Sequence, residues 1–99
     1  MNNDKRAKSG KSQLRTLFRK GTVDVILYLA TAEKARYSDI KKRQYVIGDR
    51  SLSRILKELQ KRELIRREVL PTYPVSATYA LTDKGKLVSE HLNILKEAL

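Results

Sequence analysis

The chain has no cysteine and only one histidine among its 99 residues. Without cysteine, disulfides and thiol chemistry are excluded. His91 has no set of further metal ligands nearby, so we expect no metal site and interpret it as a packed residue on an apolar helix face. No paired carboxylates and no activated nucleophile are recognisable. The sequence therefore predicts neither an enzyme nor a cofactor.

Long apolar runs are missing as well. The longest spans residues 25–30, far fewer than the ~20 residues that a membrane-spanning helix requires. The N-terminal residues are polar and do not contain the apolar stretch of a secretory signal. We therefore expect no membrane partner, and we expect a cytoplasmic, nucleoid-associated protein.

Acidic residues are in short supply: 11 Asp and Glu stand against 22 Lys and Arg, which gives a net charge of +11. The positive charge is concentrated in residues 1–20, with net +6, and in residues 34–67, with net +8. Residues 68–99 are nearly neutral, at −1. Charge of this sign and distribution predicts a polyanionic partner, either DNA or RNA.

The chain is long enough for one domain with a modest core. Residues 1–11 contain almost no apolar side chain, and we interpret them as a flexible basic arm. The arm could follow DNA or have no specific role, and the sequence favours neither alternative. Residues 12–99 are predicted to form a single domain.

Three helices are predicted in the first two thirds of this domain. Apolar residues recur at helical spacing from Ser12 to Ala30, with Gly21 as a possible break. Residues 37–43 form a short second helix that Ser38 could cap. A third helix begins near Gly48, and one apolar stripe runs along it: Leu52, Ile55, Leu56 and Leu59.

A hairpin and a last helix follow. Residues 64–70 and 75–81 read as strands, because they are rich in β-forming residues and are separated by a turn with two prolines. Thr82 is expected to cap the last helix. The order helix, helix, helix, strand, strand, helix predicts a mainly α domain with a two-stranded β-wing, the winged form of the helix-turn-helix.

The exposed side of the third helix is the predicted DNA-recognition surface. Its candidate residues are Arg50, Ser51, Ser53, Arg54, Lys57 and Lys61. Side chains of the first turns of a recognition helix meet base edges, so we assign Arg50, Ser51 and Arg54 to bases and Lys57 and Lys61 to phosphates. The alternative is the solvated face of an ordinary amphipathic helix.

Further DNA contacts are predicted on both sides of this helix. The second helix is predicted to contact the sugar-phosphate backbone of DNA through Ser38, Lys41, Lys42 and Arg43. A role in solubility alone explains each of its three cations equally well. The wing offers Arg66, Arg67 and Tyr73 for a flanking minor groove. Because Arg66 alternates away from the apolar strand residues, we favour it slightly over Arg67.

The first and last helices carry more apolar surface than one small core needs. Part of this surface is expected to form a dimer contact through Leu14, Leu17, Phe18, Val88, His91, Leu92, Leu95 and Leu99.

Four segments also match a known family. They are Ile26-Leu27, residues 36–43 (RYSDIKKR), residues 52–59 (LSRILKEL), and the stretch from Pro74 that ends in YALTDKG. Residues from about 20 to 95 resemble the HxlR-type winged-helix transcriptional regulators, relatives of the MarR group. The resemblance implies a dimer that binds palindromic operators. The chain departs from the family in having Gly21 where a Trp is common, and in lacking the cysteines through which many members sense oxidants or aldehydes.

The favoured hypothesis is a homodimeric, sequence-specific regulator that binds double-stranded DNA, with half-sites about 10 base pairs apart or a small multiple of that. The alternative is an architectural protein that coats DNA without base selection. A binder of double-stranded RNA or of ribosomes is a third, weaker hypothesis. Nothing in the sequence marks an effector ligand.

Overall fold

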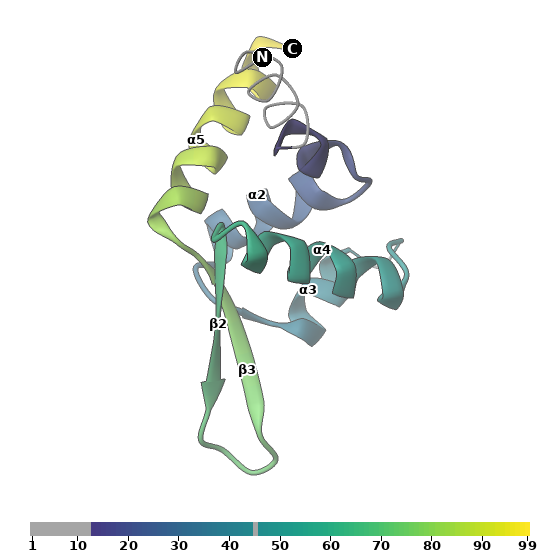
Figure 1. Ribbon diagram of the computed structural model, residues 1–99, viewed down its shortest axis with the longest axis vertical. Helices are drawn as coiled ribbons and strands as arrows, with labels where there is room; N and C mark the ends of the chain where they lie inside the picture. Colours follow the sequence, from purple (N-terminus) through teal and green to yellow (C-terminus); the bar gives the residue numbers. More distant parts are fainter. Residues whose placement is uncertain (1–12, 45) are drawn as a thin grey trace, which may run out of the picture.

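The computed structural model describes residues 13–44 and 46–99, and it confirms a mainly helical fold with a small antiparallel sheet (Figure 1). Residues 13–18 are helical. The remaining elements are α2 (Thr22–Ala32), β1 (Ala35–Arg36), α3 (Tyr37–Arg43), α4 (Asp49–Lys61), β2 (Ile65–Leu70), β3 (Ser76–Leu81) and α5 (Asp83–Ala98). The expected basic arm, residues 1–11, lies outside the described residues.

The sheet has three strands in the order β1-β3-β2, all antiparallel. The sequence predicted only the hairpin of β2 and β3. The added strand, β1, is two residues long and places Ala35 opposite Tyr79. It ties the connection between α2 and α3 to the base of the wing, and so fixes the start of α3.

Gly21 breaks the helical stretch that the sequence predicted from Ser12 to Ala30. Its φ of +93° lies in the left-handed region, where glycine is favoured because it has no Cβ. A Cβ at this position would lie 2.2 Å from Cδ1 of Ile47. The chain therefore turns at Gly21, and the loop before α4 packs closely against this turn.

The cap of α3 differs from the expectation. The N-cap residue is Arg36, and its backbone N–H donates to Oδ2 of Asp39 at 3.0 Å, so Ser38 is not the cap. The cap of α5 is confirmed: the hydroxyl of Thr82 accepts from the backbone N–H of Gly85 at 3.0 Å.

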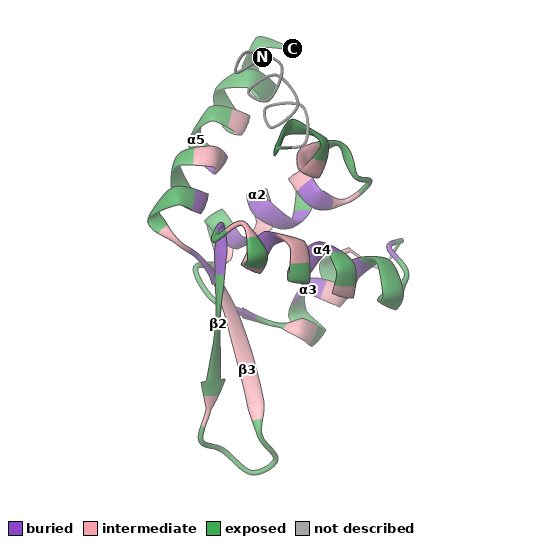
Figure 2. Ribbon diagram, in the orientation of Figure 1, coloured by how far each residue is buried: buried purple, intermediate pink, exposed green. Residues whose placement is uncertain are grey.

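The core lies where α2, α4 and the base of the sheet meet (Figure 2). The α4 stripe is buried as predicted, and no member is more than 2% exposed: Leu52, Ile55, Leu56 and Leu59. Each fully buried side chain of this kind contributes about 1.5–3 kcal/mol to folding. This burial fixes which side of α4 faces solvent.

Candidate nucleic-acid interface

Four cationic side chains lie in one row on the solvent side of α4. Arg50, Arg54, Lys57 and Lys61 are all exposed, and they are spaced by four, three and four residues. This spacing keeps them on one face of a helix, over an axial length of about 16 Å. We call this row the cationic stripe. It lies opposite the buried stripe, as the sequence predicted.

The cationic stripe has no acidic partner within residues 13–44 and 46–99. Two acidic residues adjoin it in the sequence, and both have partners outside the row. Asp49 contacts Tyr37 and Lys41, and Glu58 is half-buried, with its Oε2 3.4 Å from Nε of Arg62. The negative charge of Glu58 is therefore compensated one turn further along, outside the row. The four cations remain available to an external polyanion.

The two serines of α4 differ in their surroundings. Ser51 is exposed, whereas Ser53 is half-buried and hydrogen bonds to the phenol of Tyr37 on α3. Ser51 is thus open to a ligand, while Ser53 contributes to the contact between α3 and α4.

Tyr37 and Lys41 connect α3 to the first turn of α4. The phenol of Tyr37 lies 3.1 Å from Oδ1 of Asp49, and Nζ of Lys41 lies 3.5 Å from the same oxygen. Lys41 also donates to the backbone carbonyl of Ile47. We call these three side chains, Tyr37, Lys41 and Asp49, the α3–α4 latch. Lys41, expected at phosphates, is therefore largely engaged within the protein.

Burial raises the pKa of Tyr37. The hydrogen bond from Ser53 opposes this increase in pKa, while the hydrogen bond to Asp49 adds to it. At neutral pH the phenol therefore stays protonated and can donate to the Asp49 carboxylate.

The other cations of α3 are on its surface. Lys42, Arg43 and Ser38 are exposed. The guanidinium of Arg43 lies 5.9 Å from the centre of the Tyr28 ring, within the range of a cation–π contact. This contact places the guanidinium of Arg43 beside the Tyr28 ring, while the residue as a whole stays exposed to solvent.

The strand register separates the two wing arginines. Arg67 pairs with Tyr79. Both lie on the same face of the sheet as Ile65 and Leu81, whose side chains enter the core beside α4. Arg66 pairs with Ala80 on the opposite face, and Nη1 of Arg66 donates to the carbonyl of Leu81 at 3.4 Å.

Arg66 lies on the sheet face that points away from α4. It lines a cleft between the end of α2, β3 and α5, together with Glu33, Lys86 and Glu90. Arg67 is therefore the wing arginine on the α4 side of the sheet, whereas alternation alone had favoured Arg66 slightly for a DNA contact. Tyr73, at the tip of the wing, is fully exposed.

The profile of the HxlR-like helix-turn-helix family matches residues 11–98. The chain belongs to this family. An uncharacterised helix-turn-helix-type transcriptional regulator of Methanothermobacter thermautotrophicus is 45% identical over 64 residues, which are 65% of this chain and 49% of that protein. The chain thus spans about half the length of that relative.

Solved structures of regulators share the fold. The reduced form of the transcriptional regulator YodB from B. subtilis has a TM-score of 0.75 at 26% identity, covering 88% of this chain and 84% of that one. A crystal structure described as a putative helix-turn-helix-type transcriptional regulator, ytcD, has a TM-score of 0.77 at 28% identity, covering 88% of both chains. These matches confirm the winged-helix fold and the HxlR resemblance that the sequence indicated.

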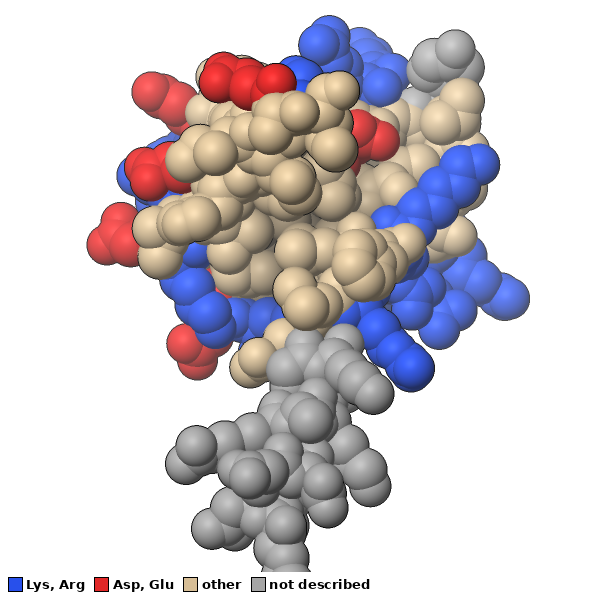
Figure 3. Space-filling model, turned by 90° about the horizontal axis from the view of Figure 1, so that it is seen from above, with Lys and Arg blue, Asp and Glu red and all other residues tan. Residues whose placement is uncertain are grey.

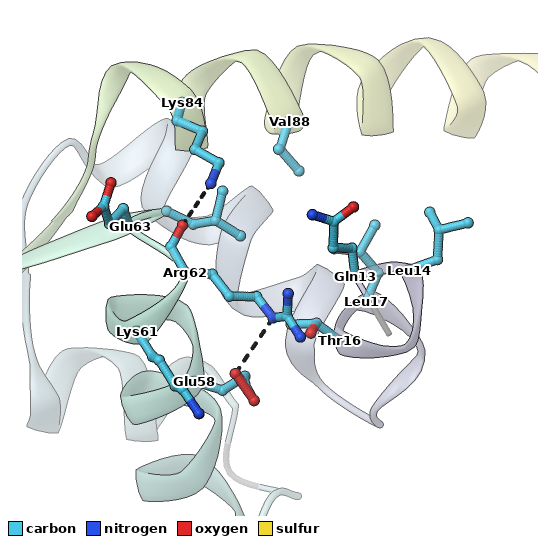
Figure 4. A pocket seen from close by; sticks show the side chains of 11 residues that line it. Gln13, Leu14, Thr16, Leu17, Glu58, Lys61, Arg62, Glu63, Lys84 and Val88 are labelled. Carbon is cyan, nitrogen blue, oxygen red and sulfur yellow. Dashed lines mark hydrogen bonds and ion pairs between the residues drawn. The ribbon is translucent and has the colours of Figure 1, made fainter. Parts of the chain in front are cut away.

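In this HxlR-family chain, α4 is joined to α5 by a compact set of hydrogen bonds. The hydroxyl of Thr82 donates to the carbonyl of Glu63 at 2.6 Å, and its backbone N–H donates to the carbonyl of Leu64 at 3.0 Å. Lys84 donates to the carbonyl of Arg62 at 2.9 Å (Figure 4). A Cβ on Gly85 would lie 2.0 Å from the Leu64 carbonyl oxygen. The end of α4 and the start of α5 are therefore held together.

A cleft of about 730 Å³ opens beside this junction. One wall is formed by Gln13, Leu14, Thr16 and Leu17, a second by the end of α4, and a third by Lys84 and Val88 of α5 (Figure 4). Three cations line it: Lys84 donates to the carbonyl of Arg62, Arg62 pairs with Glu58, and Lys61 belongs to the cationic stripe.

The expected dimer residues fall into two groups. Leu17, Val88 and Leu92 pack against the core of their own chain. Leu14, Phe18, Leu95 and Leu99 are exposed by 55% or more, and His91 is exposed as well, with Nδ1 2.9 Å from the Leu87 carbonyl oxygen. His91 is thus not packed within its own chain.

Helix α5 carries two further exposed apolar side chains, Leu87 and Ile94, which the dimer prediction did not include. They form an outward row on this helix. Leu87 and Ile94 are 55% and 65% exposed, and they lie on the same side of the helix as Leu95. Seen from the end of the molecule where α5 and residues 13–18 lie, uncharged side chains fill the middle of the surface (Figure 3). Exposed apolar side chains that gather on one part of the surface are typical of a contact between proteins.

Neither a membrane span nor a metal site is found in the described part of the chain. No helix there combines the length and the apolar character needed to cross a bilayer. No group of three or more His, Asp or Glu residues in residues 13–44 and 46–99 could hold a metal ion.

Proposed function

We propose that this chain is a sequence-specific transcriptional regulator that binds double-stranded DNA and has no catalytic activity. The observation that carries the proposal is the cationic stripe, which is unpaired within the described residues and lies on the helix that winged-helix proteins place in the major groove. Family membership and the regulator names of its relatives support the same function.

Base contacts are assigned to the first turns of α4. Arg50 and Arg54 are exposed there and can each bond to O6 and N7 of a guanine, worth about 1–3 kcal/mol of discrimination for a good pair. Ser51 is exposed beside them and can contact either a base or a phosphate. Lys57 and Lys61 lie further along α4 and are assigned to phosphates.

The backbone contacts are assigned to α3 and the base of the wing. Ser38, Lys42 and Arg43 are exposed on the helix that crosses the sugar-phosphate backbone in this docking mode. Lys41 holds the start of α4 through its bond to Ile47 rather than acting mainly on phosphates. Arg67 is favoured over Arg66 in the wing, because its side of the sheet faces α4.

The binding unit is proposed to be a homodimer of residues 12–99 on a palindromic operator in the nucleoid. Its contact would use the exposed apolar side chains of α5 and residues 13–18, namely Leu14, Phe18, Leu87, Ile94 and Leu95. Two-fold symmetry would then place two copies of α4 in successive major grooves, about 10 base pairs apart or a small multiple of that.

Selection of bound fragments from random double-stranded DNA tests the proposal. A regulator recovers a short inverted repeat, whereas an architectural protein recovers no common sequence and binds all fragments alike. Competition with double-stranded RNA distinguishes the third possibility, because a regulator keeps its DNA when RNA is added. Recovery of unrelated fragments only would contradict sequence-specific binding.

A further inference from the structure

The cleft that Arg66 lines has a volume of about 660 Å³ and lies on the sheet face that points away from α4. Its walls come from the end of α2, the connection to β1, the base of the hairpin and α5. Pockets that hold small molecules have volumes of about 300–1,000 Å³, so the cleft is large enough for one. Arg67 lies on the other face of the sheet. A molecule in the cleft would therefore leave the α4 side of the wing free.

The cleft is open because small side chains line its base. Ala80 pairs with Arg66 in the hairpin, so both lie on the same face, and Ala80 is only 6% exposed. Ser89 of α5 is 5% exposed, and its hydroxyl donates to the carbonyl of Lys86 at 2.8 Å. A longer side chain at position 80 or 89 would occupy this space.

Charges of both signs surround this base without pairing. The cations are Arg66 and Lys86, the carboxylates are Glu33 and Glu90, and all four residues are exposed. Within residues 13–44 and 46–99, no ion pair engages any of them. Opposite charges that line one cleft and stay apart can each bind the complementary group of a single molecule. The arrangement therefore fits a small molecule that has both an ammonium and a carboxylate group.

Glu33 is held in a backbone conformation that suits glycine better. Its φ of +64° and ψ of −59° are accompanied by a bond of 2.7 Å from the N–H of Lys34 to the carbonyl of Ala32. A three-residue turn of this kind is rare and strained for a residue with a Cβ. Such strain is concentrated at ligand and active sites, where a particular side chain is required. The chain thus keeps a carboxylate at the rim of the cleft where glycine would be easier to accommodate.

The end of α2 favours a positive group beside Glu33. Its last carbonyls form the negative end of the helix dipole, and its last turn contains no basic residue. Ala30 and Ala32 of this turn line the cleft. Arg66 provides the opposite charge, because its guanidinium has N–H donors beyond the one that bonds to the Leu81 carbonyl.

We propose that this cleft binds a small zwitterion, an amino acid or a short peptide, with its ammonium on Glu33 and its carboxylate on Arg66. Free amino acids and peptides share this chemistry, and they are distinguished in the test by the length of the ligand. The inference does not depend on the proposed DNA binding, since binding of the zwitterion is measured without DNA.

The first measurement is the melting temperature of the full chain with each standard L-amino acid and with a set of dipeptides and tripeptides. We expect at least one of them to raise the melting temperature by about 5 °C at ten times its dissociation constant. Analogues of that ligand without the amino group or without the carboxylate should bind at least about tenfold more weakly, because one charge of the cleft then has no partner. The inference is overturned if no compound raises the melting temperature, or if either analogue binds as well as the zwitterion.

The second measurement places the ligand on the cleft. Glu33→Gln and Arg66→Gln should each weaken its binding about tenfold, whereas Glu97→Gln, the same loss of charge elsewhere on α5, should bind like the original chain. Glu33→Gly should unfold at a temperature no lower than that of the original chain, because glycine adopts this backbone without strain, and yet lose the effect of the ligand. Equal ligand binding by Glu33→Gln and Glu97→Gln would overturn the inference. Recovery of unrelated DNA fragments only would instead contradict the proposed function and leave this result unaffected.

Discussion

The phenol of Tyr37 lies 3.1 Å from a carboxylate oxygen of Asp49, and this contact joins α3 to the first turn of α4. Lys41 approaches the same oxygen, so one carboxylate receives two donors from α3. The start of α4 is the part that enters the groove in the proposed docking mode. The α3–α4 latch therefore sets the orientation of the helix whose side chains would read bases.

Tyr37→Phe should lower stability by about 1 kcal/mol, the usual net contribution of one hydrogen bond. The free energy of unfolding of this variant should also change less at alkaline pH than that of the original chain. Burial raises the pKa of Tyr37 in the folded state above its ordinary value near 10, so the stabilisation is complete below that pH and is lost as pH rises through the higher folded-state pKa. Urea unfolding at pH 7 and at stepped pH values above 9 measures both effects.

Tyr73→Phe is the matched control for this experiment, since it removes a phenol that is fully exposed. The control should unfold like the original chain at neutral pH. If Tyr37→Phe and Tyr73→Phe showed the same alkaline loss of stability as the original chain, the structural role of the Tyr37 phenol would be rejected.

Gly21→Ala should destabilise the fold by about 2–4 kcal/mol. The cost combines a left-handed backbone position that alanine avoids with overpacking, because the new Cβ would lie 2.2 Å from Ile47. Gly48→Ala is the control, since a Cβ there meets nothing within 4 Å and the backbone is extended, with φ −65° and ψ 156°. Thermal unfolding should separate the two variants, and equal melting temperatures would contradict this account of the turn.

Helix α4 and its two faces could be predicted from the sequence because both faces are local patterns. Leu52, Ile55, Leu56 and Leu59 recur at helical spacing, and the cations recur on the opposite side, so a single segment determines what is buried and what is exposed. The cap by Thr82 was equally local. The comparisons with known proteins support the fold that these patterns predicted.

Features that depend on contacts between distant segments could not be predicted. Strand β1 is too short to show a period, and it exists because Ala35 meets Tyr79. Alternation along β2 separates Arg66 from Arg67 but does not say which sheet face lies beside α4. The hydrogen bond from Lys41 to the carbonyl of Ile47 likewise forms only because the loop before α4 lies beside α3.

Arg54→Ala and Lys57→Ala should affect DNA binding in different ways. Arg54→Ala should remove about 1–3 kcal/mol of discrimination at one base position. Lys57→Ala should weaken binding to all sequences alike. Both side chains are exposed, so stability should change by less than about 0.5 kcal/mol. Affinities for a set of single-base variants of the selected site provide the measurement, and an unchanged base preference for Arg54→Ala would reject its base contact.

Ile94→Lys should dissociate the proposed dimer without unfolding the chain. Ile94 is 65% exposed on the outward row of α5, so the substitution costs the single chain little but would bury an unpaired ammonium in a subunit contact. Asn93→Lys adds the same charge at the neighbouring exposed position, outside that row. Sedimentation of both variants should show a monomer for Ile94→Lys and a dimer for Asn93→Lys. Because a monomer engages only one half-site, Ile94→Lys should also lose most of its affinity for a complete inverted repeat while keeping its weak affinity for a single half-site. Two dimeric variants would place the subunit contact elsewhere on the molecule.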